Sequence, residues 1–180
     1  MNLAHLLANA ARSFPERAAV SIGDHRLYTY AAYGELAARL ASSMTGRLGL
    51  QAGDRVALAM TNNAEYLATL LAIWRAGLVA VPANARLHAR ELAYIVADCG
   101  ARLCIATADV AGPLADLLPR STRLVVLGEK EWRELAAADP GAIADRRPRL
   151  DFLHQRHHRP CERSHAQPPQ PDGNDGRLSR

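Results

Sequence analysis

The sequence predicts an α/β fold: an incomplete doubly wound β-α-β domain over residues 1–145, followed by a disordered tail. Short apolar strand patterns alternate with longer helical patterns, which is typical of parallel β-α-β units with right-handed crossovers. Nearly half of the 180 residues are hydrophobic (49%), enough to bury a real core, and only 5% are aromatic. After Asp145 this composition ends abruptly. The first 145 residues are therefore expected to hold the folded part.

The expected helices and strands follow from apolar spacing and from boundary residues. In chain order they are helix 3–14, strands 18–22 and 26–29, helix 31–48, strand 55–60, helix 64–76, strand 78–81, a helix from residue 88, strand 102–106, helix 110–117, strand 123–127 and helix 129–138. We find no internal repeat.

The N-terminal elements are set by caps and a turn. Asn2 is placed to cap the first helix, and Pro15 ends its apolar pattern. Gly23-Asp24 supplies the turn between the two short strands. The long amphipathic helix that follows carries one apolar stripe, formed by Leu36, Leu40, Met44 and Leu48.

The middle of the chain carries the clearest boundary signals. Asn62 stands three residues before Glu65, the spacing of a capping box, ahead of an apolar helix. Gly77 then lies at the C-cap position of that helix, and Pro82 ends the next strand.

The next helix has a start signal and an apolar face. His88 and Glu91 open it. Its periodicity is expected to place three residues against the core, namely Leu92, Ile95 and Cys99.

The tail, residues 146–180, differs from the rest in charge and composition. It holds eight Arg against four acidic residues, which accounts for the whole formal net charge of +4. It also holds four of the seven His and five of the ten Pro, with few aliphatic residues. Without a helical or strand period, it cannot bury enough apolar surface to offset its ordering entropy. We therefore expect it to be disordered.

The cysteines and the N-terminus indicate a cytoplasmic protein. Cys99, Cys104 and Cys161 form no CxxC pair and no even disulfide set. Cys99 and Cys104 lie in apolar segments, where a buried structural thiol is expected. The sequence shows neither a signal-peptide pattern nor an apolar run long enough to span a membrane.

Several segments, in a fixed order, carry a resemblance to a known family. They are Tyr28–Leu36 (YTYAAYGEL), Gly53–Leu58 (GDRVAL), Asn62–Tyr66 (NNAEY), Trp74–Leu87 (WRAGLVAVPANARL), Glu91–Ile95 and Asp98–Ala101. Together, across roughly residues 3–144, they resemble the AMP-forming acyl-CoA synthetases and adenylate-forming ligases. Read from the residues alone, the same positions are caps, turns and core positions. Gly77 and Pro82, for example, are interpreted as structural.

The resemblance implies an activity for an intact parent enzyme. Such an enzyme activates a carboxylic acid with ATP to an acyl-adenylate and transfers it to CoA with release of AMP. ATP, Mg²⁺ and CoA are thereby implied for the parent. A medium- or long-chain fatty acid is the expected substrate, with an aryl acid such as a cinnamate as the alternative.

The resemblance also implies that this chain lacks the chemistry. The family's Ser/Thr/Gly-rich phosphate loop is expected where the tail begins, and nothing in residues 146–180 matches it. Its other nucleotide motifs and its catalytic lysine would lie beyond Arg180. Lys130 is the only lysine and a poor candidate for catalysis. We therefore assign no catalytic, cofactor-binding or metal-binding residue, and expect the chain alone to be inactive and to bind no cofactor.

The tail has an explanation at the level of codons. Reading residues 154–159 (HQRHHR) from the second base of each codon permits Thr-Ser-Gly-Thr-Thr-Gly, which is similar to the family's phosphate loop. Glu162-Arg163 permits Lys-Gly in the same frame, whereas Cys161 departs from the pattern. We interpret this as a one-base shift of the reading frame near residues 145–148.

The tail and the chain as a whole allow three alternative interpretations. A zinc site would use imidazole and thiolate ligands, but the spacing of the available residues matches no recognised finger. Those residues are His154, His157, His158, Cys161 and His165. A basic tail could contact RNA or an acidic partner, although no specific nucleic acid is implied. A non-catalytic binding module is the third reading. We also expect exposed apolar surface and self-association.

Overall fold

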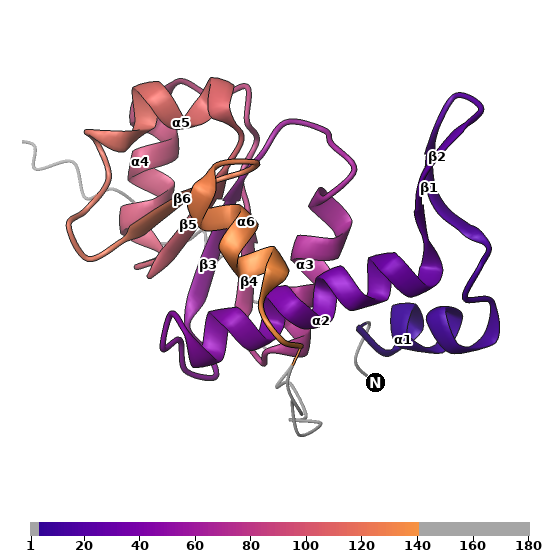
Figure 1. The fold of residues 1–180 in the computed structure, drawn as a ribbon. Coiled ribbons are helices and arrows are strands. Elements are labelled where there is room, and N and C mark those ends of the chain that lie inside the picture. The colour runs from indigo at the N-terminus through magenta and orange to yellow at the C-terminus, as the bar shows by residue number, and fades with distance from the viewer. Residues whose placement is uncertain (1–3, 141–180) are drawn as a thin grey trace, which may run out of the picture.

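The computed structural model describes residues 4–140, which form a four-stranded parallel sheet with helices on both faces and a separate hairpin (Figure 1). The elements are α1 (Ala4–Ser13), β1 (Ala18–Ile22), β2 (His25–Thr29), α2 (Tyr30–Gly46), β3 (Arg55–Ala59), α3 (Tyr66–Arg75), β4 (Val79–Pro82), α4 (Ala89–Asp98), β5 (Leu103–Ala106), α5 (Ala108–Ala115), β6 (Arg123–Val126) and α6 (Lys130–Ala137). The predicted α/β class is confirmed. The predicted tail, its zinc alternative and the frame shift lie outside the described residues.

The sheet is wound in both directions from its first strand. The strand order is β4-β3-β5-β6, and all the pairs are parallel. At the centre, Val56 of β3 pairs with Ala80 on one side and with Leu103 on the other. The chain thus runs from β3 to β4, returns past β3 to β5, and continues outward to β6. This reversal is the topological switch point of a doubly wound sheet.

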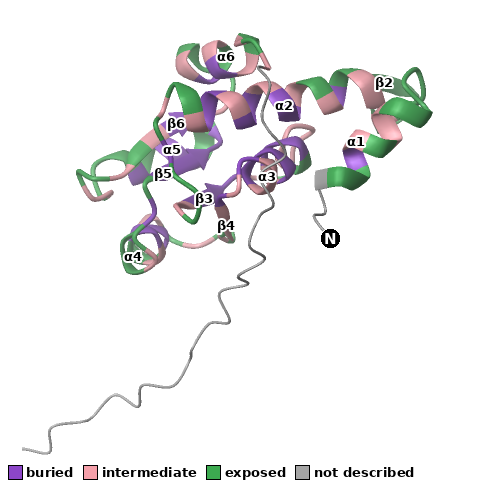
Figure 2. Ribbon diagram, turned by 90° about the horizontal axis from the view of Figure 1, so that it is seen from below, coloured by how far each residue is buried: buried purple, intermediate pink, exposed green. Residues whose placement is uncertain are grey.

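The two faces of the sheet bury different residues. On one face, Val56, Leu58 and Ile105 pack with α2, α3 and α6 into a core of large side chains. On the other face, the small residues Ala57 and Cys104 pack with residues of α4 and α5. Figure 2 shows the buried strands between these helices. Strands covered on both faces read as continuous apolar runs, which explains why the strands were identified from sequence.

The hairpin stands apart from the main sheet. Strands β1 and β2 pair only with each other, antiparallel, and Gly23 at φ +55° supplies the turn that the sequence predicted. Figure 1 shows the hairpin projecting from the N-terminal end of α2, away from the parallel sheet. Its outer side leaves Ile22 and Leu27 exposed. An isolated two-stranded hairpin is marginally stable in water, so the stability of this hairpin depends on its contacts with the rest of the chain.

The apolar stripe predicted for the region of α2 lies against the core, but the buried surface of the helix is wider than this stripe. Leu40 and Met44 are fully buried, but Leu36 and Leu48 are only half-buried. Leu36 and Leu48 also pack against the core, and further residues of this helix are buried beside them, namely Tyr33, Ala37, Ala38 and Ala41. The reason is that α1, α3 and α6 all contact α2, so the buried surface is broader than one stripe. Small residues allow the close approach: a Cβ at Gly34 would lie 3.1 Å from the Cβ of Ala11.

The ends of two helices follow the predicted capping chemistry. His88 is the N-cap of α4 and forms a capping box with Glu91. Gly77, at φ +75°, follows the last turn of α3. Its N–H donates to the Trp74 carbonyl and the Leu78 N–H to the Ile73 carbonyl, the two bonds of a Schellman motif.

The core-facing residues of α4 differ from the prediction. Leu92 is buried as expected, whereas Ile95 and Cys99 are only partly buried. Cys99 still packs against the core, as predicted, and Ala93 and Val96 are buried where Ile95 was expected. The helix therefore presents a face rotated toward these small residues, which meet the small residues of the strands.

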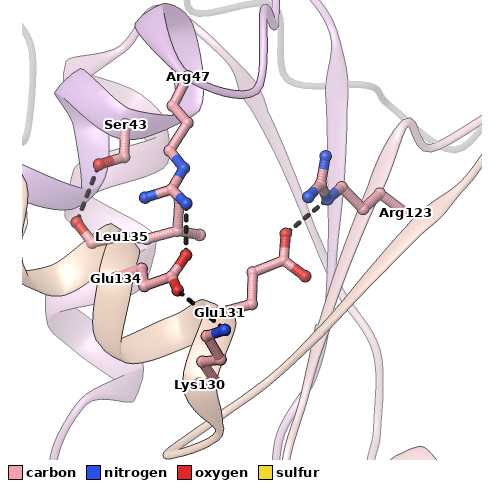
Figure 3. A network of polar contacts seen from close by, with 7 residues as sticks. All are labelled: Ser43, Arg47, Arg123, Lys130, Glu131, Glu134 and Leu135. Carbon is pink, nitrogen blue, oxygen red and sulfur yellow. Dashed lines mark hydrogen bonds and ion pairs between the residues drawn. The ribbon is translucent and has the colours of Figure 1, made fainter.

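Helix α6 is fastened to α2 by both apolar and polar contacts. Trp132 and Leu135 are buried. The Ser43 hydroxyl donates to the Leu135 carbonyl at 2.9 Å inside this contact, and Arg47 pairs with Glu134 at its rim (Figure 3). The buried side chains and the buried hydrogen bond are expected to hold α6 on α2, because a surface ion pair contributes little on its own.

Candidate functional site

The place in this fold where a ligand is expected is the carboxyl edge of the sheet at the switch point. In doubly wound sheets, ligands bind outside the carboxyl ends of the strands where the winding reverses. Here that place lies between the ends of β3 and β5, which reach the edge at Ala59 and Ala106. The segments that follow are the loop 60–65, which leads to α3, and Thr107, the N-cap residue of α5.

Two threonine hydroxyls meet across this edge. The Thr107 Oγ1 accepts a hydrogen bond from the Thr61 N–H at 3.2 Å and lies 3.3 Å from the Thr61 Oγ1. Thr107 is 7% exposed, whereas Thr61 is half-buried. The Thr107 side chain makes no cap bond within its own helix. It ties the two strand ends together instead.

The loop 60–65 does not form the predicted capping box. Helix α3 begins at Tyr66 with Glu65 as its N-cap residue in a helical conformation, and no side chain of that residue caps the helix. The Asn63 side chain accepts from the Glu65 N–H at 3.0 Å and donates to the Thr61 carbonyl at 2.6 Å. Asn62 is exposed. The Asn63 bonds form a local turn of the kind that asparagine favours.

A tyrosine from α2 performs the capping that Asn62 was expected to provide. The Tyr33 hydroxyl accepts from the Ala68 N–H at 2.9 Å and donates to the Ala64 carbonyl at 2.6 Å. The Ala68 N–H lies in the first turn of α3, where backbone donors have no partner within the helix. Burial raises the pKa of the Tyr33 hydroxyl, which stays protonated and is able to donate.

Glu65 is engaged from the other side by the hairpin. The Tyr28 hydroxyl donates to the Glu65 Oε1 at 2.8 Å. Burial, and then the hydrogen bond to the Glu65 carboxylate, raise the pKa of Tyr28 to about 12. The Glu65 carboxylate is thereby held beside the N-terminus of α3, where a negative charge is favourable.

The described residues offer hydrogen bonds at this edge but no reacting group. The hydroxyls of Thr61 and Thr107 have no adjacent base that would activate them. Burial raises the pKa of the Cys104 thiol to about 12, so it is not a nucleophile at neutral pH. Within residues 4–140, no group of three or more His, Cys, Asp or Glu could hold a metal ion. These residues therefore do not fit the ATP and Mg²⁺ that the resemblance implies.

Two hollows in the described surface do not change this conclusion. One holds only ≈10 Å³, between α1, α2 and α3. The other, of ≈150 Å³, is lined by Arg102, Ser121 and Arg123 at the opposite, amino edge of the sheet. Arg102 pairs with Asp54 at 2.8 Å and Arg123 with Glu131 at 2.5 Å (Figure 3 shows the second pair). The positive charge of the two arginines that line this hollow is thus balanced by two carboxylates.

The sequence assigned no site residue, and the positions it singled out are structural or outside the description. Gly77 and Pro82 lie at a helix end and a strand end. Lys130 is exposed on α6 and lies 3.9 Å from Glu134. Thr61 and Thr107 were missed. The sequence could have indicated these two threonines, because each directly follows a predicted strand, 55–60 or 102–106. Among the described helices, none is long and apolar enough to cross a membrane.

Comparison with protein families and curated proteins gives a consistent result. Residues 7–175 match the family model described as AMP-binding enzyme, a range that includes most of the predicted tail. A medium/long-chain-fatty-acid–CoA/3-oxocholest-4-en-26-oate–CoA ligase of Mycobacterium marinum is 32% identical over 84% of this chain and 28% of its own. A feruloyl-CoA synthase of an Amycolatopsis species is 40% identical over 66% and 24%.

A solved structure shares the arrangement of elements. The Mycobacterium tuberculosis fatty acyl CoA synthetase superposes with a TM-score of 0.70 at 30% identity, over 80% of this chain and 30% of that one. The chain spans about a quarter of the length of the curated relatives that it matches.

Proposed function

Since the chain belongs to the AMP-binding enzyme family, we propose that it is the amino-terminal part of an acid–thiol ligase. The proposed reaction of the intact protein joins a carboxylic acid to CoA through an acyl-adenylate, with ATP converted to AMP and pyrophosphate. The observation that carries the proposal is the family match over residues 7–175. The identity to CoA ligases over more than four-fifths of the chain supports it.

A fatty acid of medium or long chain is the substrate that we propose first. Ligases for such acids are among the relatives, and a fatty acyl CoA synthetase shares the fold. An aryl acid is the second candidate, because a feruloyl-CoA synthase is 40% identical over a shorter range. The larger of the two hollows described above lies at the amino edge of the sheet, away from the switch point. Acyl selection is therefore proposed to lie in the remainder of the intact enzyme.

We propose further that the 180-residue chain is inactive by itself. The described residues supply scaffold: caps, turns, core positions and the braced loop 60–65. Adenylyl transfer depends on donors and cations positioned around the phosphates, and residues 4–140 do not present such a set. In this proposal, residues 1–145 are the folded part of the ligase domain and 146–180 are read out of frame. The family match runs on to residue 175 and so does not support the frame shift.

The reading frame is tested on the DNA. We expect the coding sequence, shifted by one base after codon 148, to encode Thr-Ser-Gly-Thr-Thr-Gly and then more of a ligase. Unrelated codons in that frame would refute the shift and favour a basic tail with its own role.

The substrate is tested on a version whose frame is restored through the whole gene. It is incubated with ATP, Mg²⁺ and CoA, and the acyl-CoA products are separated by chromatography. We expect thioesters of decanoate or palmitate to form faster than that of ferulate. The reverse order would favour the aryl alternative, and no thioester with any acid would refute the proposed function.

We propose that the isolated chain self-associates, because large apolar side chains are exposed on several elements. Among the described residues these are Leu6, Phe14, Ile22, Leu27, Leu67, Tyr94 and Leu117. Sedimentation velocity at increasing concentration is expected to show species larger than 19.5 kDa. A single monomeric boundary at all concentrations would contradict this.

A further inference from the structure

Two of the segments that carry the family resemblance are in direct contact. Tyr28 and Tyr33 come from the YTYAAYGEL segment, and Glu65 comes from NNAEY. Although 37 residues separate Tyr28 from Glu65, their side chains share a hydrogen bond of 2.8 Å. The rings of Tyr28 and Tyr33 lie against each other, with centroids 5.4 Å apart. The contact joins β2 and the start of α2 to the loop that leads into α3.

This contact is the polar link between the hairpin and the rest of the described fold. The strands β1 and β2 form no ladder with the parallel sheet. The Arg26 guanidinium bonds only to the nearby Glu16 carbonyl. Of the side-chain hydrogen bonds made by the described residues 18–29, that of Tyr28 to Glu65 is the one that reaches beyond the adjacent segments.

The same contact holds the loop at the carboxyl edge of the sheet. Glu65 accepts the Tyr28 hydrogen bond with its side chain, and its N–H is held by Asn63. The Tyr33 hydroxyl fixes the residues on either side, through the Ala64 carbonyl and the Ala68 N–H. If Tyr28 is released, Glu65 therefore loses the partner that connects this loop to the hairpin.

We propose that the hydrogen bond between Tyr28 and Glu65 couples the β1–β2 hairpin to residues 61–65 of the loop, so that the two segments unfold locally and refold as one unit. We call this contact the latch. The consequence is a coupling between two surfaces: whatever orders the hairpin also orders the loop beside Thr61 and Thr107. The latch depends only on the described contacts, and it holds whether or not the intact protein is a ligase.

The test is hydrogen exchange of the 180-residue chain followed by mass spectrometry. In the unmodified chain, peptides from 18–29 and 61–65 are followed as small amounts of denaturant are added. A shared opening gives the two peptides the same free energy and the same denaturant dependence. Separate values for the two peptides would overturn the latch without any substitution, so the test does not depend on whether a variant folds.

Variants then identify the contact responsible. Tyr28→Phe removes the donor while keeping the ring, and Glu65→Ala removes the acceptor. Each is expected to speed exchange about tenfold in both peptides, as for a hydrogen bond to a charged acceptor. Glu65→Gln keeps an acceptor oxygen but loses the charge, and is expected to speed exchange by less than Glu65→Ala does.

A matched control separates the latch from general destabilisation. Ser43→Ala removes the buried bond to the Leu135 carbonyl on α6, and is expected to speed exchange in α6 but not selectively in 18–29 and 61–65. The proposal is overturned if Tyr28→Phe affects the hairpin alone. It is equally overturned if Ser43→Ala reproduces the pattern of Tyr28→Phe, or if Glu65→Gln is as damaging as Glu65→Ala.

Discussion

Replacing Tyr33 with Phe removes one oxygen atom that makes two hydrogen bonds at the start of α3. Tyr33 is 3% exposed, and its hydroxyl joins the Ala64 carbonyl and the Ala68 N–H. Phenylalanine keeps the ring and its packing. The Ala68 N–H would then be buried without a partner, whereas the Ala64 carbonyl belongs to a half-buried residue that water can reach.

The cost follows from these two groups. A buried donor left without a partner costs about 1–3 kcal/mol, and losing a helix cap costs about 1 kcal/mol. The two estimates describe the same N–H in part, so we expect a loss of about 2 kcal/mol. Against a total of about 5–15 kcal/mol for a folded domain, this is a substantial fraction.

The assay is urea unfolding followed by circular dichroism at a chain concentration low enough to keep the protein monomeric. With a denaturant slope of about 1–3 kcal/mol per molar, the midpoint should fall by about 1 M. Tyr94→Phe is the matched control, because Tyr94 is 69% exposed on α4, and it should leave the midpoint unchanged. A loss of less than about 0.5 kcal/mol for Tyr33→Phe, the range of surface substitutions, would refute the reasoning about the cap.

Three further predictions concern the core, the thiols and alkaline pH. Leu58→Ala, at a fully buried position of the central strand, should cost about 2–5 kcal/mol in the same urea assay, whereas Leu67→Ala at a 51% exposed position should cost much less; equal costs would contradict the assigned core. Burial raises the pKa of the Cys104 thiol to about 12. In a chain with Cys99→Ser and Cys161→Ser, Cys104 should therefore resist a thiol reagent at neutral pH until denaturant is added. Rapid labelling of the native chain would count against the burial of Cys104. The folded pKa of Tyr28 is raised to about 12 from an unfolded value of about 10. The contribution of Tyr28 to the free energy of unfolding is therefore complete below a pH of about 10 and is lost as the pH rises toward about 12. Tyr28→Phe should make the stability of the chain less sensitive to pH in this window, and an unaltered alkaline profile would contradict the shift.

Helix ends set by local chemistry were predictable from the sequence, whereas the cap of α3 was not. Gly77 and His88 act through their own backbone and immediate neighbours, so the signal and its cause lie in the same few residues. The pairing of Asn62 with Glu65 had the spacing of a capping box but failed. Tyr28 holds the Glu65 side chain, from a segment distant in sequence. Competition of this kind arises only in the folded chain.

The candidate site was missed for a related reason. Thr61 and Thr107 meet because β5 lies beside β3, with β4 on the far side. Alternating strands and helices predicted parallel strands, but not this order within the sheet. The apolar stripe of α2 was predicted too narrowly for the same reason, since α1, α3 and α6 pack on it from different directions.

We propose above that this chain, which shares part of the fold of a fatty acyl CoA synthetase, does not carry out the ligase reaction by itself. The most direct measurement is acid-dependent pyrophosphate release from ATP by the purified 180-residue chain, with the version whose frame is restored as the positive control. We expect no release above background from the 180-residue chain and release that depends on added fatty acid from the restored version. Release by the 180-residue chain at a comparable rate would contradict the claim, because a site within these residues would then be supplying the chemistry.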